Sequence, residues 1–172
     1  MTDSVPILPV SGLTIAYSAV EDRLVLWLRG QDQVVPLLFT RRLSALLING
    51  LAGILARSSP AAAQAPAALR DDVILMEHQG AMAQSAAPTP DLAPPAPTEA
   101  TAAPMLVETV NITTNPMDFQ LIFRPPGGGG LAIKLSRADL HRVLELLRRY
   151  TQEADWALPT QPGWLTTQVT VN

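Results

Sequence analysis

Three short β-forming segments and an apolar helix follow one another in residues 13–57, LTIAYSAVEDRLVLWLRGQDQVVPLLFTRRLSALLINGLAGILAR. The segments 13–19 and 24–29 are separated by a short polar turn, which is the pattern of a β-hairpin. The segment 34–39 predicts a third strand, in which Pro36 favours an edge position or a bulge because proline cannot donate a ladder hydrogen bond. This stretch therefore predicts a small antiparallel sheet that runs directly into a helix.

The second half of the chain repeats this order of elements. Thr40 and Ser136 are both suitable N-caps, and they predict helices over 41–57 and 137–156. Strands are expected ahead of the second helix at 107–113, 119–123 and 131–135. We interpret the two βββα units as an internal duplication related by a pseudo-twofold axis. The alternative is that a common local pattern occurs twice by chance. Two copies do not decide between these interpretations, because repeat arguments usually rest on at least three copies.

The chain is expected to adopt an α+β fold in four parts. These are a first βββα unit at 1–59, a middle helix packing on it at 60–84, a disordered Pro/Ala-rich linker at 85–104, and a second βββα unit at 105–172. The linker contains six prolines, a composition that favours an extended tether. The tail over 165–171 alternates apolar and polar residues, which predicts an added edge strand. The two sheets are expected to form one continuous sheet or a small sandwich.

The composition of the 172 residues argues against several classes of protein. The net charge of −3 provides no basic field that would attract nucleic acid or anionic lipid. The chain has no cysteine, so disulfides, thiolate metal sites and cysteine nucleophiles are excluded. The N-terminus lacks the features of a secretory signal, and the longest apolar helix is shorter than the roughly 20 residues that cross a bilayer. We therefore expect a soluble cytoplasmic protein.

The first helix is apolar on most of its surface, and this is the strongest functional signal in the sequence. Its apolar residues surround a single polar break at Asn49, so the sheet can cover only one of its sides. The remaining cover is expected from the middle helix or from a second subunit. The middle helix carries an apolar stripe, expected to pack on the first helix, formed by Leu69, Val73, Met76, Gly80 and Ala83. The residues expected to bind a partner are Leu46, Ile48, Leu51, Leu55, Met76 and Trp164.

No set of side chains in the sequence has the spacing of a known catalytic or metal motif. Imidazole and carboxylate are both metal ligands, and such groups could converge from Glu77, His78, His141 and Glu145. The two pairs lie on different expected helices, however, so we interpret His141 and Glu145 as part of a solvated face and His78 as a surface or helix-contact residue. The Gly-rich segment 125–130 joins two strands, so it predicts a flexible hairpin loop rather than a phosphate loop.

We expect a non-enzymatic interaction or assembly protein that acts through the first and middle helices. It is expected to need no cofactor and no metal, and to bind a protein partner or a second copy as a homodimer. A second hypothesis is a nucleic-acid-associated regulator that uses a modest basic patch on the last helix, formed by Arg137, Arg142, Arg148 and Arg149. A third hypothesis is a metal-dependent enzyme that uses His78 and His141.

Overall fold

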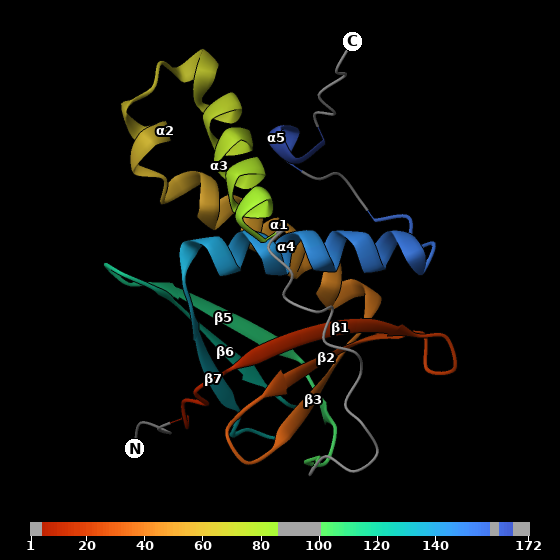
Figure 1. Ribbon diagram of the computed structural model, residues 1–172. Coiled ribbons are helices and arrows are strands. Elements are labelled where there is room, and N and C mark those ends of the chain that lie inside the picture. The colour runs from red at the N-terminus through yellow and green to blue at the C-terminus, as the bar shows by residue number, and fades with distance from the viewer. Residues whose placement is uncertain (1–4, 86–100, 159–161, 167–172) are drawn as a thin grey trace.

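The computed structural model describes residues 5–85, 101–158 and 162–166. It shows the mixed α+β protein that the sequence predicts, with a four-stranded sheet, a three-stranded sheet and a layer of helices above them (Figure 1). Most of the predicted linker lies outside the described residues, and so do residues 167–171 of the predicted C-terminal strand.

The first sheet is antiparallel through its first three strands. Its strands, in order across the sheet, are β1 (Gly12–Ser18), β2 (Arg23–Arg29), β3 (Val34–Phe39) and β4 (Met105–Leu106). The register places Ile15 opposite Leu26 and Leu26 opposite Leu37. All three side chains are buried, so one apolar row crosses the sheet and fixes its register.

The second sheet has the same antiparallel arrangement. Its strands are β5 (Thr109–Thr114), β6 (Phe119–Arg124) and β7 (Leu131–Leu135). The register places Ile112 opposite Leu121 and Leu121 opposite Ile133. The two sheets meet in a single apolar core, where the rings of Phe39 and Phe123 pack edge to face with centroids 6.0 Å apart.

Each half of the chain lends its leading segment to the sheet of the other half. Residues 101–106 run parallel to β3, and the Ala102 N–H donates to the Val34 carbonyl at 2.8 Å. The Leu8 N–H likewise donates to the carbonyl of Ala132 in β7 at 2.8 Å. The segment paired with β3 leads into β5 of the second sheet, and the segment paired with β7 leads into β1 of the first sheet. The two sheets are therefore linked to each other at both ends. Residues 101–104, which were predicted to belong to the linker, are thus part of the fold.

Around Pro36 the pairing of β3 with the incoming segment shifts by one residue, from Val34 opposite Thr101 to Leu37 opposite Met105, as a bulge would shift it. Pro36 lies in a strand that is paired on both sides, so of the edge position and the bulge predicted for it, the edge position is wrong. It stands opposite Trp27 of β2, while β4 pairs with β3 on the other side. The incoming segment donates hydrogen bonds to carbonyls of β3, including that of Leu38, which accepts from the Val107 N–H at 3.0 Å. Pairing through carbonyls tolerates the missing N–H of proline.

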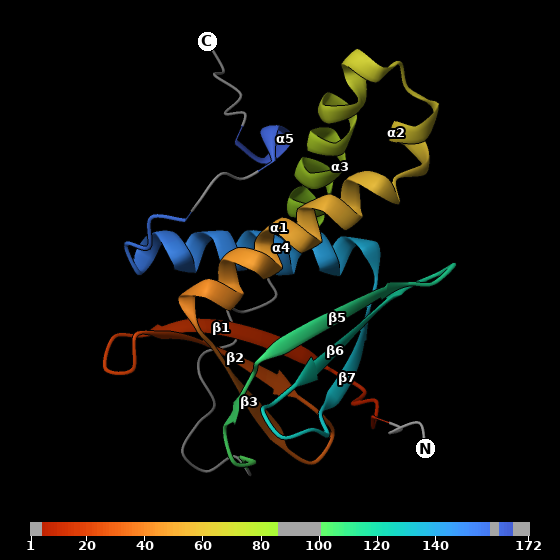
Figure 2. The ribbon, with the colours of Figure 1, turned by 180° about the vertical axis from the view of Figure 1, so that it is seen from behind.

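Both long helices begin at their predicted N-caps. Helix α1 (Arg41–Arg57) follows Thr40, whose Oγ1 accepts a hydrogen bond from the Leu43 N–H at 3.2 Å. Helix α4 (Arg137–Glu153) follows Ser136, whose Oγ accepts from the Asp139 N–H at 3.1 Å. The two helices cross each other (Figure 2), and α4 also packs on β1. The order βββα is therefore present in both halves, and the duplication stays an interpretation of it.

The middle of the chain forms three helical elements instead of one helix. These are α2 (Pro60–Gln64), the 3₁₀ turn η1 (Ala67–Leu69) and α3 (Arg70–Ser85). Helix α3 packs on α4 and also touches α1. The fully buried side chains of α3 are Ile74, His78 and Ala81, so the face predicted to pack on the first helix is wrong. The predicted stripe instead turns outward at Leu69, Met76, Gly80 and Ala83.

The first two residues of the predicted edge strand, 165 and 166, belong to a helix instead, while the rest of that prediction lies outside the described residues. The short helix α5 (Gly163–Thr166) contacts α3. It buries Trp164 and Leu165, and this burial outweighs the alternating pattern that suggested a strand. Trp164 thereby comes to lie beside two histidines, which form the site described next.

Candidate functional site

Two histidines that are far apart in the sequence meet between α3 and α4. The Nδ1 atoms of His78 and His141 lie 3.2 Å apart, and the ring centroids are separated by 5.3 Å. The side chains are buried, with exposed fractions of 7% for His78 and 2% for His141. The sequence named these histidines together with Glu77 and Glu145, and the structure brings all four together. We refer to His78 and His141 as the histidine pair.

A carboxylate lies behind each imidazole. Oε2 of Glu145 is 3.3 Å from Nε2 of His78, within hydrogen-bond distance. Oε2 of Glu77 is 3.9 Å from Nε2 of His141, which is an electrostatic contact only. Each carboxylate also accepts from an arginine of α4, since Arg148 donates to Glu145 at 2.9 Å and Arg137 donates to Glu77 at 2.7 Å.

The guanidinium of Arg137 ties the start of α4 to two other helices. Its Nη1 donates to Oγ of Ser58 at 2.9 Å, and its Nη2 donates to the Leu55 carbonyl at 2.6 Å, both at the end of α1. The other oxygen of Glu77 accepts from the hydroxyl of Ser59, the N-cap of α2, at 2.6 Å. These bonds fix the rotation of α3, because Glu77 can reach Arg137 only when His78 faces α4.

Trp164 covers the histidine pair from α5. Its ring packs edge-on against His78 and His141, with centroid separations of 5.7 and 6.4 Å. Within the described part of the chain, Nε1 of Trp164 and Nε2 of His141 are buried and have no hydrogen-bond partner. A buried polar atom without a hydrogen-bond partner lowers the stability of the folded state. The packing of Trp164 on the histidine pair therefore attaches α5 but carries this energetic cost.

The protonation of His141 is strongly affected by its surroundings. Its pKa is lowered to about 4, chiefly by burial and then by the nearby charges of His78 and Arg137, while the charge of Glu77 opposes the shift. The pKa of Glu145 is also lowered, chiefly by its hydrogen bond with His78. His141 is therefore neutral at pH 7. One imidazole donates a hydrogen bond through Nδ1 and the other accepts it, which is possible when both rings are neutral or when only one of them is protonated.

The arrangement offers little to a metal ion. Only two nitrogens face each other, and the carboxylates lie behind the rings rather than beside those nitrogens. Among the residues that the structure describes, no group of three or more His, Asp or Glu side chains could hold a metal ion. Structural zinc sites take four ligands and catalytic ones take three, so the metal hypothesis for His78 and His141 gains no support.

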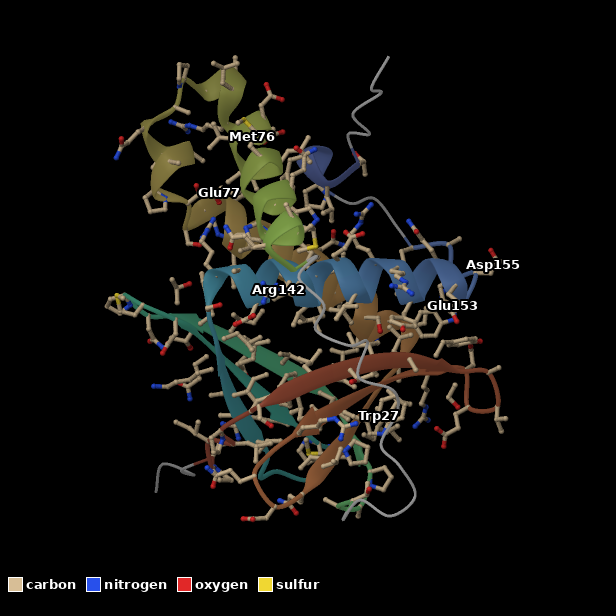
Figure 3. All side chains as sticks on the ribbon, viewed as in Figure 1. Trp27, Met76, Glu77, Arg142, Glu153 and Asp155 are labelled. Atoms are coloured by element: carbon tan, nitrogen blue, oxygen red, sulfur yellow. The ribbon has the colours of Figure 1, made fainter. Side chains whose placement is uncertain are left out.

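Of the six residues that the sequence proposed for partner binding, four are buried in the structure and two are exposed. Ile48, Leu51, Leu55 and Trp164 are buried within the chain and belong to its core. The apolar excess of α1 is thus covered largely by α4 and α3 of the same chain. Leu46 and Met76 are exposed, with fractions of 60% and 69%. Met76 lies on α3, on the side of α4 away from the sheets (Figure 3).

The arginines proposed for nucleic acid are engaged within the chain. Arg137 and Arg148 bind the carboxylates of the site, and Arg142 donates to Asp139 at 2.8 Å. The guanidinium of Arg149 lies 5.5 Å from the ring centroid of Tyr150. Three of these four side chains are therefore neutralised by a carboxylate, which leaves a weak field for phosphate.

Arg137 and Trp164 belong to the site, but they were not assigned to it from the sequence. Arg137, His141 and Glu145 stand at i, i+4 and i+8 of one helix, so their common face could have been recognised. Trp164 carried no local signal for this role, because its contact with the histidine pair depends on the path of the chain after α4.

No helix among the described residues is long and apolar enough to cross a membrane. Comparison of the chain with protein-family models, curated proteins and solved structures found no match.

Proposed function

We propose that this chain is a non-enzymatic interaction or assembly protein that binds a protein partner, or a second copy of itself, through the outer face of α3. This outer face consists of Met76, Gly80 and Ala83 of α3 together with Leu69, the last residue of the 3₁₀ turn η1 that leads into it. The observation that carries the proposal is the exposure of the two large side chains, 50% for Leu69 and 69% for Met76. They lie on the stripe that a second helix would contact.

The outer face has the character of a helix-packing surface. Single exposed apolar side chains are common, but here they share one helical stripe with small residues. A Cβ atom built on Gly80 meets no other atom within 4 Å, so a partner helix could approach closely there. Leu46 on α1, which is 60% exposed, offers a further contact point. Apolar surface of this kind commonly marks sites of association.

The titratable residues of the site bind one another, and this supports a non-enzymatic role. The histidine pair is buried, and Glu77 and Glu145 each accept a hydrogen bond from an arginine. A general base must come within hydrogen-bond reach of a substrate, and these groups already reach one another. The absence of cysteine from the sequence is consistent with action in a reducing compartment, and we place the protein in the cytoplasm.

Sedimentation velocity over a concentration series tests the proposal, with Met76→Glu as the variant. The matched control is Met117→Glu, since Met117 is 90% exposed but lies in the turn between β5 and β6. Neither change should alter folding stability by more than about 0.5 kcal/mol, because both side chains are in solvent. Self-association should weaken at least about tenfold in Met76→Glu and stay unchanged in the control.

A different protein as the partner is tested by placing a photo-crosslinking amino acid at position 76 or position 117 of the full chain. A discrete crosslinked product at position 76 that is missing at position 117, and that is lost when Leu69 is changed to Glu, would support the proposal. Equal or no crosslinking at both positions, together with a strict monomer at high concentration, would contradict it.

A further inference from the structure

We propose that the histidine pair is a pH-operated contact that holds α3 and α5 on α4 while one imidazole is neutral, and releases them when both imidazoles are protonated. The inference goes beyond the proposed function, and it concerns the chain alone, so it does not depend on any partner.

The contact between the rings works for only some protonation states. With Nδ1 atoms 3.2 Å apart, one nitrogen must donate and the other must accept. When both imidazoles are protonated, both Nδ1 atoms carry hydrogen and neither can accept. The same step places two positive charges in a buried contact, where water screens them poorly. Acid therefore turns an attractive contact into a repulsive one.

The charged groups around the histidine pair already balance one another, so they provide no net negative charge to offset two protonated imidazoles. The groups that face it are Glu77 on α3 and Arg137, Glu145 and Arg148 on α4. Two carboxylates are thus already matched by two guanidinium groups. The contacts from α1 are the Leu55 carbonyl and the Ser58 hydroxyl, both uncharged.

The remaining elements around α3 add no compensating charge at the rings. Helix α5 presents the uncharged indole of Trp164, and α2 presents the Ser59 hydroxyl to Glu77. Asp71 of α3 lies near Gly163 at the start of α5, where a Cβ built on the glycine would be 3.6 Å from its Oδ2. This carboxylate is two helical turns from His78, so it does not pair with either ring.

His141 is the ring whose protonation the buried site opposes. Its pKa is held at about 4, chiefly by burial. The carboxylate of Glu145 lies within hydrogen-bond distance of Nε2 of His78, so it contacts the other ring of the pair and not His141. In the released state His141 would titrate at its ordinary pKa of about 6.5. Release therefore binds a proton, and it is favoured as the pH falls from about 6.5 toward 4.

Helix α3 is the element that such a change can displace. Its buried side chains are Ile74, His78 and Ala81, and the ion pair of Glu77 with Arg137 is its other tie to α4, so the histidine is one of few contacts that attach it. Helix α4, by contrast, buries Leu140, Val143, Leu144 and Leu147 as well as His141. The sheets and α4 therefore keep their structure at a pH at which α3 separates from them. Release also uncovers Ile74 and Ala81, which extends the apolar surface of α3.

Hydrogen exchange followed by mass spectrometry on the full chain tests this proposal. Exchange is measured from about pH 7.5 to pH 4 and corrected for the intrinsic pH dependence of amide exchange. Protection of peptides from α3 and α5 should fall at least about tenfold near pH 5, while peptides from β2 and β6 stay protected. Loss of protection in all of these peptides together, or no loss down to pH 4, would overturn the proposal.

Two variants separate the histidine pair from other acid effects. His141→Gln keeps a hydrogen-bonding side chain that does not titrate, so the acid-induced loss in α3 should disappear. Glu145→Gln removes a negative charge beside the histidine pair, so a positively charged pair is less stable there and the loss should begin at a higher pH. An unchanged transition in Glu145→Gln would refute the proposal even if His141→Gln failed to fold, and so would the wild-type transition persisting in a folded His141→Gln.

Discussion

Arg137 joins three helices through one guanidinium group. It binds Glu77 of α3 and the Leu55 carbonyl and Ser58 hydroxyl of α1, while its own backbone begins α4. Arg142, little more than one turn later on the same helix, makes a single ion pair with Asp139 at the surface. The two arginines carry the same charge but differ in the number of groups that they bind. We therefore expect them to contribute differently to the free energy of unfolding.

Replacing Arg137 by alanine should lower the free energy of unfolding by about 3 kcal/mol, because it leaves Glu77 and a backbone carbonyl without their partner. Arg142→Ala should cost less than about 1 kcal/mol, as is usual for an exposed ion pair. Urea denaturation at pH 7 measures both values. Equal losses in the two variants would contradict the role given to Arg137.

His141 should make the stability of the folded chain depend on pH. Its pKa is about 4 when folded and about 6.5 when unfolded, so the unfolded chain binds more protons between these values. Its contribution is fully present above pH 6.5 and is lost as the pH falls, by about 3 kcal/mol at pH 4. Denaturation of wild type and His141→Gln at several pH values should give curves that diverge in acid, and parallel curves would disagree with this assignment.

The sequence predicted the elements whose signals are local. The strands of both halves and the starts of α1 and α4 follow from alternation and from the N-caps Thr40 and Ser136. The buried face of α3 could not be predicted, because it is set by the pairing of Glu77 with Arg137 across helices. The two histidines and two glutamates of the site were named from the sequence, but spacing along one helix does not predict that residues of α3 and α4 converge.

The loop between β6 and β7 has a requirement for glycine at one end. Gly130 has a φ of 135°, and a Cβ added there would lie 2.4 Å from the Phe123 carbonyl oxygen. Gly128 also has a positive φ, 99°, but a Cβ added there meets no atom within 4 Å. Gly130→Ala should therefore cost more than about 2 kcal/mol, and Gly128→Ala about 1 kcal/mol. Thermal unfolding measures both, and the reverse order would contradict the loop geometry.

At the scale of the molecule, the exchange of leading segments makes the two sheets interdependent. The segment before β1 pairs with β7, the segment before β5 pairs with β3, and both sheets share one core. The sequence predicted that the two sheets would form one continuous sheet or a small sandwich. It did not predict the exchange of leading segments, since local patterns do not reveal parallel pairing between segments that lie far apart along the chain.

Destabilising one sheet should therefore destabilise the other. Leu24 in β2 and Leu121 in β6 are both buried, and each change to alanine should cost about 2–5 kcal/mol. Hydrogen exchange in low denaturant measures this coupling. Leu24→Ala should weaken the protection of β6 as much as that of β2, and Leu121→Ala should weaken the protection of β2 as much as that of β6. Protection lost only in the mutated sheet would show two independent units.

The central claim is that two buried imidazoles join α3 to α4 by sharing one proton. Long-range ¹H–¹⁵N NMR of the imidazole rings, recorded on the wild-type chain from about pH 7.5 to pH 4, reports the protonation of each nitrogen directly. We predict that His141 stays neutral well below pH 6, with the proton of the pair between the two Nδ1 atoms, and that it titrates toward pH 4. Two independent titrations near the ordinary pKa of about 6.5 would contradict the account.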